Sequence, residues 1–351
     1  MASMAQAIRM ALHYGEKHLD VKDIFGEDVG APLGGVFTCT QGLETTWNTP
    51  LDERGIIGCA MGVALTGDRC VAEIQFCDYI FNTIDLLKLV GNTYWSTNGL
   101  FNLPLVIMTP VGAGIHGSIY HSHSFDAIAT RLPGFKVVMP SNAKDAYGLL
   151  LAAIKDPNPV LYLKPKALMR VKGKELLAGE PESDRELKAM IDAPVGDRSK
   201  WKANWPELED ESVELGKAKT VIEGDQVTVV TYGRHVLECE VAIKEVQSQG
   251  VSVELIDLRT LYPYDWPCIQ KSIEKTGRVI FVNEDTEVTN FAEHLVYRTT
   301  QELFYHLLAR PRVLAGKNLP GIGLSPALEY ASVPMKADIV NEILDVVKEL
   351  P

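Results

Sequence analysis

Apolar residues in this chain recur in two patterns that together predict alternating strands and helices. Helical spacing marks both ends of the chain, at Met4, Ile8, Ala11 and Leu12 and again at Ile339, Ile343, Val346 and Leu350. Stretches of strand length lie between them. One is the short strand expected over 22–25, and the others are largely apolar, over 70–76, 105–108, 135–140, 159–163, 227–232, 253–258 and 279–282. Helical patterns separate most of these runs, as over 56–65, 80–91, 143–155, 236–246 and 292–308. The alternation predicts an α/β fold with doubly wound, mainly parallel sheets.

Between residues 107 and 125 the sequence joins a buried strand to a loop rich in glycine and histidine. We expect the strand to break at Pro110, after which glycines let the backbone take positive φ angles and approach a ligand closely. The loop carries Gly112, Gly114, Gly117, His116, His121 and His123. This arrangement favours a ligand crevice at the end of a strand in an open α/β sheet, although a surface loop with incidental histidines has the same composition. Further along, Ser141 is expected to cap the helix over 143–155.

The composition changes between residues 175 and 214. Charge is dense in this stretch, long apolar runs are absent, and three prolines interrupt it: Pro181, Pro194 and Pro206. We therefore expect an α/β domain over 1–174, a charged linker over 175–214 that lies on the surface, and a second α/β domain over 215–351. Trp201 and Trp205 could hold the linker to a domain or a partner, or could serve local packing.

The chain has 351 residues, of which 46% are hydrophobic and 23% charged, as in ordinary globular proteins with room for two cores. Its formal net charge of -12 argues against nucleic acid or an anionic membrane as a partner. No run of about 18 apolar residues predicts a membrane span. Six cysteines without a C-x-x-C pair, and a first helix without a signal-peptide pattern, favour reduced thiols and a cytoplasmic location.

Five residues lie where ligands bind in open α/β sheets, near the carboxyl end of a predicted strand or at the start of the next helix: Glu27, Glu53, Gln75, Tyr79 and His121. Simpler interpretations exist for two of them. Glu27 could be a solvated turn residue, and Glu53 could merely complement a helix dipole. If they are held in a crevice, the same carboxylates would act as hydrogen-bond acceptors or bases.

Missing motifs exclude several common kinds of site. The sequence has no G-x-S-x-G elbow of a serine hydrolase and no G-x-x-x-x-G-K-[ST] phosphate loop. His121 and His123 could contribute to a metal site, but a zinc site needs at least three protein ligands.

At these residues the sequence resembles the beta subunits of the thiamine-diphosphate-dependent 2-oxo acid dehydrogenases, the E1 components of multienzyme complexes. Five matching motifs lie in the first half: F-G-E-D-V over 25–29, G-G-V-F over 34–37, T-P-L-x-E over 49–53, E-I-Q-F-x-D-Y over 73–79 and Y-H-S over 120–122. A sixth, E-L-I-D-L-R-T, covers 254–260. Together they span most of the chain in the family's order. The resemblance implies a transketolase-like pyrimidine-binding domain followed by a transketolase C-terminal domain.

The resemblance also implies a role for each residue singled out above. Glu53 matches the catalytic glutamate that hydrogen-bonds the aminopyrimidine ring of thiamine diphosphate and so activates the thiazolium carbon. Tyr79 matches the aromatic side chain that stacks on this ring, and Leu51 and Gln75 match its neighbours. His121 matches a histidine near the reacting centre, suited to proton transfer or to stabilising a developing alkoxide. Glu27 matches an acid in the polar path that links two active sites.

Metal ions and partner subunits follow from the same resemblance. Similar enzymes hold the diphosphate through magnesium on a G-D-G…N-N motif, which this chain lacks. We therefore expect an E1 alpha subunit to supply the magnesium and diphosphate half in an α2β2 heterotetramer, and a lipoyl-bearing E2 acyltransferase to receive the acyl group. The family also carries a potassium ion under the glycine-histidine loop, and the matching positions, mostly main-chain oxygens, are Leu103, Leu105, Ala153, Asp156 and Asn158.

The implied function is that of an oxidoreductase that decarboxylates a 2-oxo acid and transfers the acyl group to a lipoyl group. The G-G-V-F motif, Gln75 and the Y-H-S motif resemble the branched-chain (2-oxoisovalerate) members more than the pyruvate members. His123, Phe125-Asp126 and Thr289-Asn290 depart from the family's pattern, and these departures bear on substrate choice more than on reaction type. Two alternatives stay open: a pyruvate or acetoin dehydrogenase beta subunit, and a non-catalytic scaffold subunit.

Overall fold

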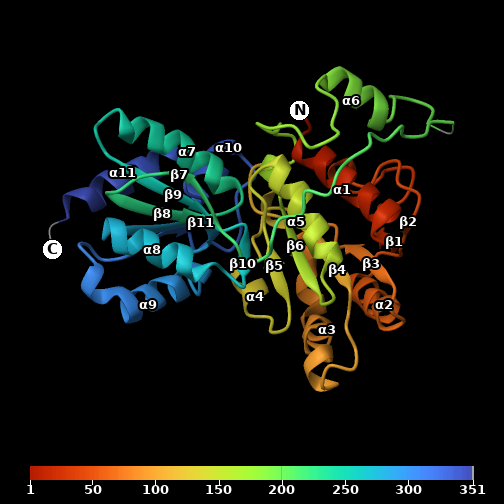
Figure 1. The fold of residues 1–351 in the computed structure, drawn as a ribbon, viewed down its shortest axis with the longest axis horizontal. Coiled ribbons are helices and arrows are strands. Elements are labelled where there is room, and N and C mark those ends of the chain that lie inside the picture. Colours follow the sequence, from red (N-terminus) through yellow and green to blue (C-terminus); the bar gives the residue numbers. More distant parts are fainter. Residues whose placement is uncertain (199, 350–351) are drawn as a thin grey trace. The chain divides into compact units, whose positions relative to one another are not determined.

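The structure is a computed structural model that describes residues 1–198 and 200–349 (Figure 1). The chain divides into two compact units, each built from three segments. The first unit contains Met1–Pro110, Leu132–Lys164 and Leu168–Leu215, and the second contains Val111–Arg131, Pro165–Ala167 and the chain from Gly216 onward. The glycine-histidine loop over 112–123 therefore belongs to the second unit, although it lies in the first half of the sequence.

A parallel sheet forms the core of the first unit. Its strands are, in spatial order, β5 (Lys136–Val138), β6 (Val160–Pro165), β4 (Leu105–Val111), β3 (Arg69–Glu73), β1 (Val21–Gly26) and β2 (Thr46–Asn48). β1 pairs in parallel with β2 and β3, β3 with β4, and β5 with β6, with Ile24 opposite Val71 and Val71 opposite Val106. The central strands β3 and β4 are buried along almost their whole length, as in parallel sheets covered on both faces.

Four helices and two short 3₁₀ segments accompany this sheet: α1 (Met4–His18), α2 (Glu53–Leu65), α3 (Ile84–Ser96), α5 (Ala143–Lys155), η1 (Val36–Thr38) and η2 (Cys77–Thr83). α1 packs along α5, while α2 packs against β3 and α3 (Figure 1). The first helix begins with a capping box, in which Gln6 donates its backbone N–H to Ser3 Oγ at 3.3 Å and accepts from the backbone N–H of Ser3 at 3.0 Å.

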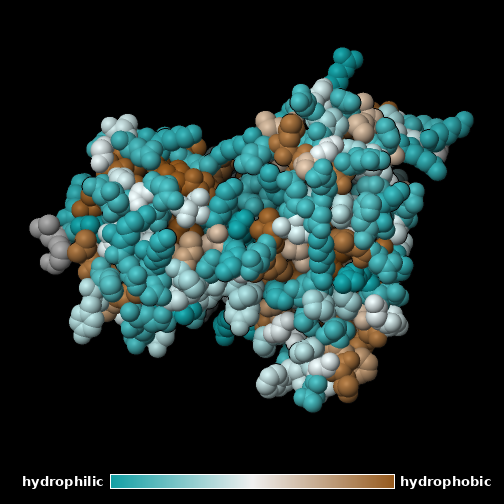
Figure 2. Space-filling view, viewed as in Figure 1, coloured by the Kyte–Doolittle hydropathy of each residue, from teal (hydrophilic) through white to brown (hydrophobic). Residues whose placement is uncertain are grey.

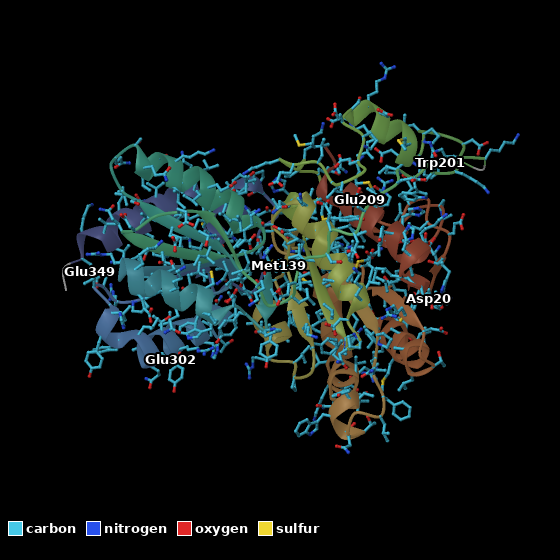
Figure 3. The ribbon with its side chains drawn as sticks, viewed as in Figure 1. Asp20, Met139, Trp201, Glu209, Glu302 and Glu349 are labelled. Carbon is cyan, nitrogen blue, oxygen red and sulfur yellow. The ribbon has the colours of Figure 1, made fainter. Side chains whose placement is uncertain are left out.

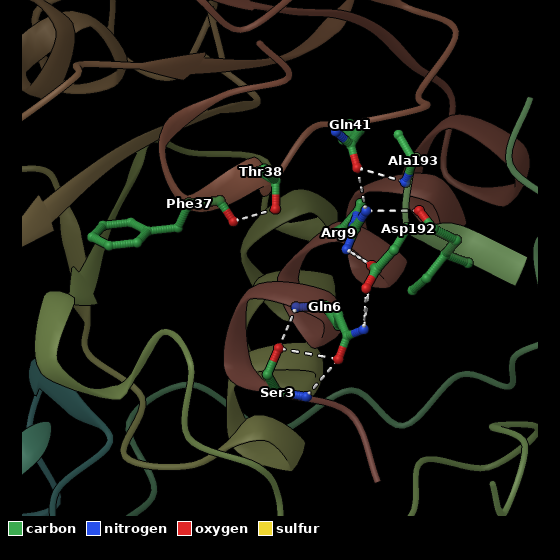
Figure 4. A network of polar contacts seen from close by, with 9 residues as sticks. Ser3, Gln6, Arg9, Phe37, Thr38, Gln41, Asp192 and Ala193 are labelled. Carbon is green, nitrogen blue, oxygen red and sulfur yellow. Dashed lines mark hydrogen bonds and ion pairs between the residues drawn. The ribbon is translucent and has the colours of Figure 1, made fainter. Parts of the chain in front are cut away.

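The charged segment 175–214 packs within the first unit and contains α6 (Asp184–Ile191). Its anchor is Arg9 of α1, whose side chain is only 2% exposed. The Arg9 guanidinium donates to Asp192 Oδ1 at 2.6 Å and to the main-chain oxygen of Ile191 at 2.7 Å (Figure 4). Because a buried charge is tolerated only when it is paired and hydrogen-bonded, this contact fixes the segment to α1.

Two tryptophans of this segment lie against the first unit as well. The Trp205 indole stacks on the His13 ring, with centroids 4.2 Å apart, so local packing accounts for it. Trp201, labelled in Figure 3, covers Gly42, where an added Cβ would lie 2.9 Å from the indole ring. The segment therefore follows the surface of one unit.

The second unit has a sheet in the order β12 (Arg312–Gly316), β11 (Val279–Thr286), β8 (Val227–Thr231), β9 (Val253–Asp257) and β7 (Lys219–Ile222). β7 is antiparallel to β9, and the other pairs are parallel. One face carries α7 (Arg234–Gln247) and α11 (Lys336–Lys348), and the other carries α8 (Trp266–Thr276) and α9 (Phe291–Leu303) (Figure 1). The shorter elements are η3 (Ser118–Tyr120), α4 (Asp126–Thr130), η4 (Lys166–Leu168), β10 (Thr260–Tyr262), η5 (Phe304–His306) and α10 (Pro326–Ser332).

The fold class expected from the sequence, two doubly wound and mainly parallel α/β sheets, is confirmed. Two local expectations are wrong. β4 continues through Pro110 to Val111, and this is possible because its pairing with β3 ends at Met108, so that β3 needs no N–H at position 110. α5 is capped by Asn142, whose side chain accepts from the backbone N–H of Asp145 at 2.9 Å, and not by Ser141. The predicted helix position Leu350 lies outside the described residues.

Helices long and apolar enough to cross a membrane are absent from residues 1–198 and 200–349.

Candidate active site

The carboxyl ends of β1 and β3 bring the predicted residues of the first unit together, as the geometry of parallel sheets requires. Glu27 follows β1 directly, and Gln75 and Tyr79 follow β3, with Tyr79 in η2. Glu53 is the first residue of α2. The turn after β1 meets the turn after β3 where Gln75 Nε2 donates to Asp28 Oδ2 at 3.0 Å.

A glycine makes this close approach of two strands possible. Gly26, the last residue of β1, has φ 157°, and an added Cβ would lie 2.3 Å from the main-chain oxygen of Glu73. Its own carbonyl accepts from the backbone N–H of Thr49 at 3.0 Å, which draws in the segment that leads to Glu53. The F-G-E-D-V motif thus places Glu27 through the glycine that precedes it.

Glu27 is a buried acid in an environment that disfavours its charge. The residue is 4% exposed, and neither carboxylate oxygen has a hydrogen-bond partner within the described part of the chain. Burial, together with the nearby carboxylates of Glu53, Asp28 and Asp52, raises the pKa of Glu27 to about 7. Its solvated-turn interpretation is therefore wrong. An acid that changes its charge near neutral pH is suited to moving a proton.

Glu53 is held at the start of α2 by a residue that the sequence did not single out. Asn82 Nδ2 donates to Glu53 Oε2 at 3.1 Å, which orients the carboxylate. The Tyr79 ring meets the edge of Phe76 with centroids 6.1 Å apart, and burial and the carboxylates of Asp78, Glu27 and Glu53 raise the pKa of its hydroxyl. Leu51, two residues before Glu53, is 82% exposed.

These residues fit the pyrimidine half of thiamine diphosphate. Glu27 presents buried acceptor oxygens without donors among the described residues, and Glu53 presents a carboxylate near enough to Tyr79 to add to the effect of burial in raising the pKa of the tyrosine hydroxyl. Leu51, two residues before Glu53, is exposed. A flat ring that bears N–H groups offers hydrogen-bond donors to the acids and apolar faces to Tyr79 and Leu51.

His121 belongs to the second unit, whereas Glu27, Glu53, Gln75 and Tyr79 belong to the first. It follows η3, where its backbone N–H donates to the main-chain oxygen of Ser118 at 3.4 Å. The loop before it is held at its start, because the backbone N–H of Ala113 donates to Glu284 Oε2 at 2.9 Å and that of Gly112 to the main-chain oxygen of His123 at 2.8 Å.

The second unit also contains a group of buried acids that the sequence did not connect with one another. Asp126, Glu284 and Asp285 are all buried, and Asp285 Oδ2 accepts from the backbone N–H of Ala127 at 3.0 Å. Burial, with the charges of Asp285 and Glu284, raises the pKa of Asp126 well above its usual value. Position at the end of β11 was the available signal for Glu284 and Asp285.

The positions predicted to ligate potassium lie near the start of β4, at Leu103 and Leu105, and at the end of α5, at Ala153, Asp156 and Asn158. Asn158 Oδ1 is buried and has no hydrogen-bond partner among the residues described. An oxygen atom of this kind is able to bind a cation. Asp156, however, already pairs with Lys136, which neutralises part of the local negative charge. Potassium binding stays a prediction. In the described chain, no cluster of three or more His, Cys, Asp or Glu side chains is placed to hold a metal ion.

A groove of about 1420 Å³ in the first unit lies elsewhere. It runs between the end of α1 and the segment 193–208, and its lining includes His13, Trp201 and Trp205. None of the described residues predicted to bind the cofactor lines it. The groove is therefore separate from the residues predicted to form the cofactor site.

Comparison with known protein families divides the chain in two. Residues 1–172 match the pyrimidine binding domain of transketolase, and residues 216–339 match the transketolase C-terminal domain. A solved structure described as a split-gene transketolase, an inactive beta4 tetramer, is similar in fold to this chain, with a TM-score of 0.73. The similarity covers 100% of this chain and 100% of the other. At 18% sequence identity, that likeness concerns the fold alone.

Curated relatives are similar over most of the chain. A 2-oxoisovalerate dehydrogenase subunit beta from Pseudomonas aeruginosa is 36% identical over 96% of this chain and 92% of its own length. One from Bacillus subtilis is 34% identical over 87% of this chain and 86% of its own length. A pyruvate dehydrogenase E1 component subunit beta from Acholeplasma laidlawii is 36% identical over 88% of this chain and 87% of its own length.

The raised pKa of Glu27 makes stability depend on pH. In the unfolded chain Glu27 loses its proton near its ordinary pKa of 4.5, but in the folded chain it keeps the proton to about pH 7. Between these values the folded state binds more protons, so the free energy of unfolding falls as pH rises, and the loss is complete above pH 7. We expect Glu27→Gln to remove this loss, so that its melting temperature relative to wild type is higher at pH 8 than at pH 5.

Thermal unfolding of the chain at several pH values measures this difference. Glu44→Gln, which removes one exposed acid from the same unit, serves as the control. A constant difference in melting temperature between Glu27→Gln and wild type from pH 5 to pH 8 would show that Glu27 does not titrate there.

Proposed function

The chain belongs to the beta subunits of the 2-oxo acid dehydrogenase E1 enzymes, and from this premise we propose that it activates thiamine diphosphate through Glu53. The proposed reaction is the oxidative decarboxylation of a branched-chain 2-oxo acid with acyl transfer to a lipoyl group on E2. One observation carries the proposal: Glu53 is oriented by Asn82 at the start of α2, in the same unit as Tyr79 and the donor-free acid Glu27.

Each residue of the site has a task that its surroundings support. Thiamine diphosphate, when bound, supplies the carbon nucleophile and the electron sink for decarboxylation. The Glu53 carboxylate would accept a hydrogen bond from an N–H of the pyrimidine ring, and the N-terminus of α2 favours negative charge there. Tyr79 and Leu51 would pack against the ring and exclude water. Glu27, with a pKa of about 7, would hold or release a proton in the same unit.

A branched-chain substrate is the finer part of the proposal. The residues that support it are the G-G-V-F motif over 34–37, Gln75, and the Y-H-S motif over 120–122. Relatives named for pyruvate and for 2-oxoisovalerate match this chain at similar identity, so the motifs and not the overall similarity favour 2-oxoisovalerate. His121 is proposed as the group that serves acyl transfer.

An E1 alpha subunit is the proposed partner, and the exposed surface of α2 and α3 supports it. Gly58 and Gly62 on α2 are exposed, and an added Cβ at either position would meet no atom within 4 Å. Large apolar side chains are exposed on α2, on α3 and in the chain next to them: Leu51, Leu65, Leu89, Trp95, Leu100 and Phe101. Hydrophobic atoms are visible at the surface where α3 lies (Figure 2). An apolar surface of this kind marks a protein–protein interface. The α2β2 assembly and the lipoyl-bearing E2 follow as further proposals.

Glu53 should be indispensable for turnover. In enzyme assembled with an alpha subunit, we expect Glu53→Gln to lower kcat by about 100-fold or more, because an uncharged amide is a weaker acceptor than a carboxylate and cannot act as a base. Circular dichroism should show an intact fold. Asp68→Asn, an exposed acid beyond the other end of α2, is the control. Near-normal turnover of Glu53→Gln would remove the proposed role and favour the scaffold alternative.

Substrate choice is decided by a ratio of specificity constants. We expect kcat/KM of the assembled enzyme to be about 10-fold or more higher for 2-oxoisovalerate than for pyruvate, since two methyl groups buried in an apolar pocket are worth this much discrimination. Steady-state kinetics with both acids and with acetoin measures the ratio. A preference for pyruvate or acetoin would replace the branched-chain assignment and keep the reaction class.

The α2 surface should be needed for assembly but not for folding. We expect Gly58→Leu to keep the melting temperature of the chain within a few degrees, because nothing opposes a side chain there, and to abolish the complex with the alpha subunit. Light scattering of the mixed subunits reads out assembly. Lys188→Leu adds a leucine to an exposed position of α6 as the matched control. Full assembly of Gly58→Leu would place the interface elsewhere.

A further inference from the structure

The short helix α10 is attached to the second unit by a buried glutamate. Only two of its seven residues are buried, Glu329 and Ser332, whereas its apolar residues Leu328 and Tyr330 are exposed. Glu329 itself is fully inaccessible to solvent. An acid buried in this way requires donors, and the donors show what the helix holds.

Among the residues that the structure describes, the donors that meet Glu329 come from the glycine-histidine loop. The backbone N–H of Gly114 donates to Glu329 Oε1 at 2.5 Å, and that of His116 donates to Oε2 at 2.8 Å. The His116 ring adds a third contact, with Nδ1 at 3.1 Å from Oε2. Three nitrogens of one loop thus converge on the two oxygens of a single carboxylate.

The chain around α10 reinforces this contact. The backbone N–H of Lys317 donates to the main-chain oxygen of Ser332 at 2.9 Å and so closes the segment 317–332 on itself. Gly321 in this segment lies against Ile119, where an added Cβ would be 2.3 Å from Ile119 Cγ2. The segment therefore contacts the loop at Gly114, His116 and Ile119.

The loop needs such support because its backbone is strained. His116 has φ 56° and Ser118 has φ 58°, both in the left-handed region that residues other than glycine adopt at a cost. Ser118 in turn accepts the backbone N–H of His121 at 3.4 Å, and an added Cβ at Gly117 would lie 2.5 Å from His121 Cβ. The conformation that Glu329 fixes at His116 therefore sets the position of His121.

We propose that Glu329 is a positioning residue for His121, which it places by binding the backbone of the loop at Gly114 and His116. The proposal rests on the function proposed above for His121 in acyl transfer. Glu329 lies more than 200 residues from the loop in sequence and has no part in the family motifs quoted for the site. It touches neither substrate nor cofactor in this role.

The test uses Glu329→Gln in the enzyme assembled with an alpha subunit and a lipoyl domain. The amide keeps the side chain's shape but replaces one acceptor oxygen with a donor, so at least one loop N–H loses its partner. We expect hydrogen exchange at Gly114 and His116 to be about 10-fold or more faster. We also expect acyl-transfer kcat to fall by about 10-fold to 100-fold, since small displacements of a catalytic group have effects of this size. Affinity for thiamine diphosphate should not change.

Two further variants separate positioning from general damage. Glu329→Asp keeps the carboxylate and should recover part of the lost acyl-transfer rate, while Glu293→Gln removes an exposed acid of the same unit and should leave both exchange and rate unchanged. In a His121→Ala background, Glu329→Gln should cause no further loss, because it acts through the histidine.

These experiments give different results if the role of Glu329 fails and if the function proposed for His121 fails. Unchanged exchange at Gly114 and His116 in Glu329→Gln would overturn the contact itself. An equal further loss of rate in the His121→Ala background would overturn positioning through His121. If His121→Ala alone retained full acyl transfer, the function proposed for His121 would fail, and with it the role of Glu329, whatever the exchange result.

Discussion

The first unit depends on a buried ion pair between Glu73 and Lys164. Neither side chain is accessible to solvent, and the two come from the end of β3 and from β6. Burial alone would lower the pKa of Lys164, but the Glu73 carboxylate raises it above its usual value, so the lysine stays charged. Removing one partner of such a pair costs about 3–5 kcal/mol, because the other charge is left uncompensated. The other oxygen of Glu73 accepts from the backbone N–H of Val36 at 3.1 Å. The pair therefore fixes the strand end from which Gln75 and Tyr79 emerge.

The sequence predicts most of the fold because buried parallel strands are continuous apolar runs, as in β4 and β6. It does not predict the edge strands β2 and β7. β2 and β7 are short and partly exposed, with no apolar run to mark them. α8 is a different case, because its signals were present and unused: Asp265 caps its start, and Gly277, in the left-handed conformation, ends it. Local sequence patterns also do not predict that the segment 111–131 packs in the same unit as the chain from Gly216 onward.

The candidate site was predictable to the extent that it follows strand ends. Glu27, Gln75 and Tyr79 were found by that rule, and Glu53 by its place at the start of a helix. Asn82 and Glu329 were not found, because each acts through one or a few hydrogen bonds to a partner that no spacing rule connects to it. A side chain that binds backbone N–H groups leaves no motif, since every residue type but proline offers the same donor.

Each unit contains a buried glutamate, and the two differ in whether the fold supplies hydrogen-bond donors to the carboxylate. The Glu329 carboxylate is contacted by three nitrogens of a strained loop and holds this loop in place, so its oxygens serve the fold. Glu27 receives no donor from the described chain, and crowding by Glu53, Asp28 and Asp52 raises its pKa to about 7. An acid without donors lowers its free energy by holding a proton, which it can give up when a ligand or a charge nearby changes. The raised pKa of Glu27 therefore follows from the lack of hydrogen-bond donors and from the nearby acids, whereas the conformation of the loop in the second unit follows from the donors that it offers to Glu329.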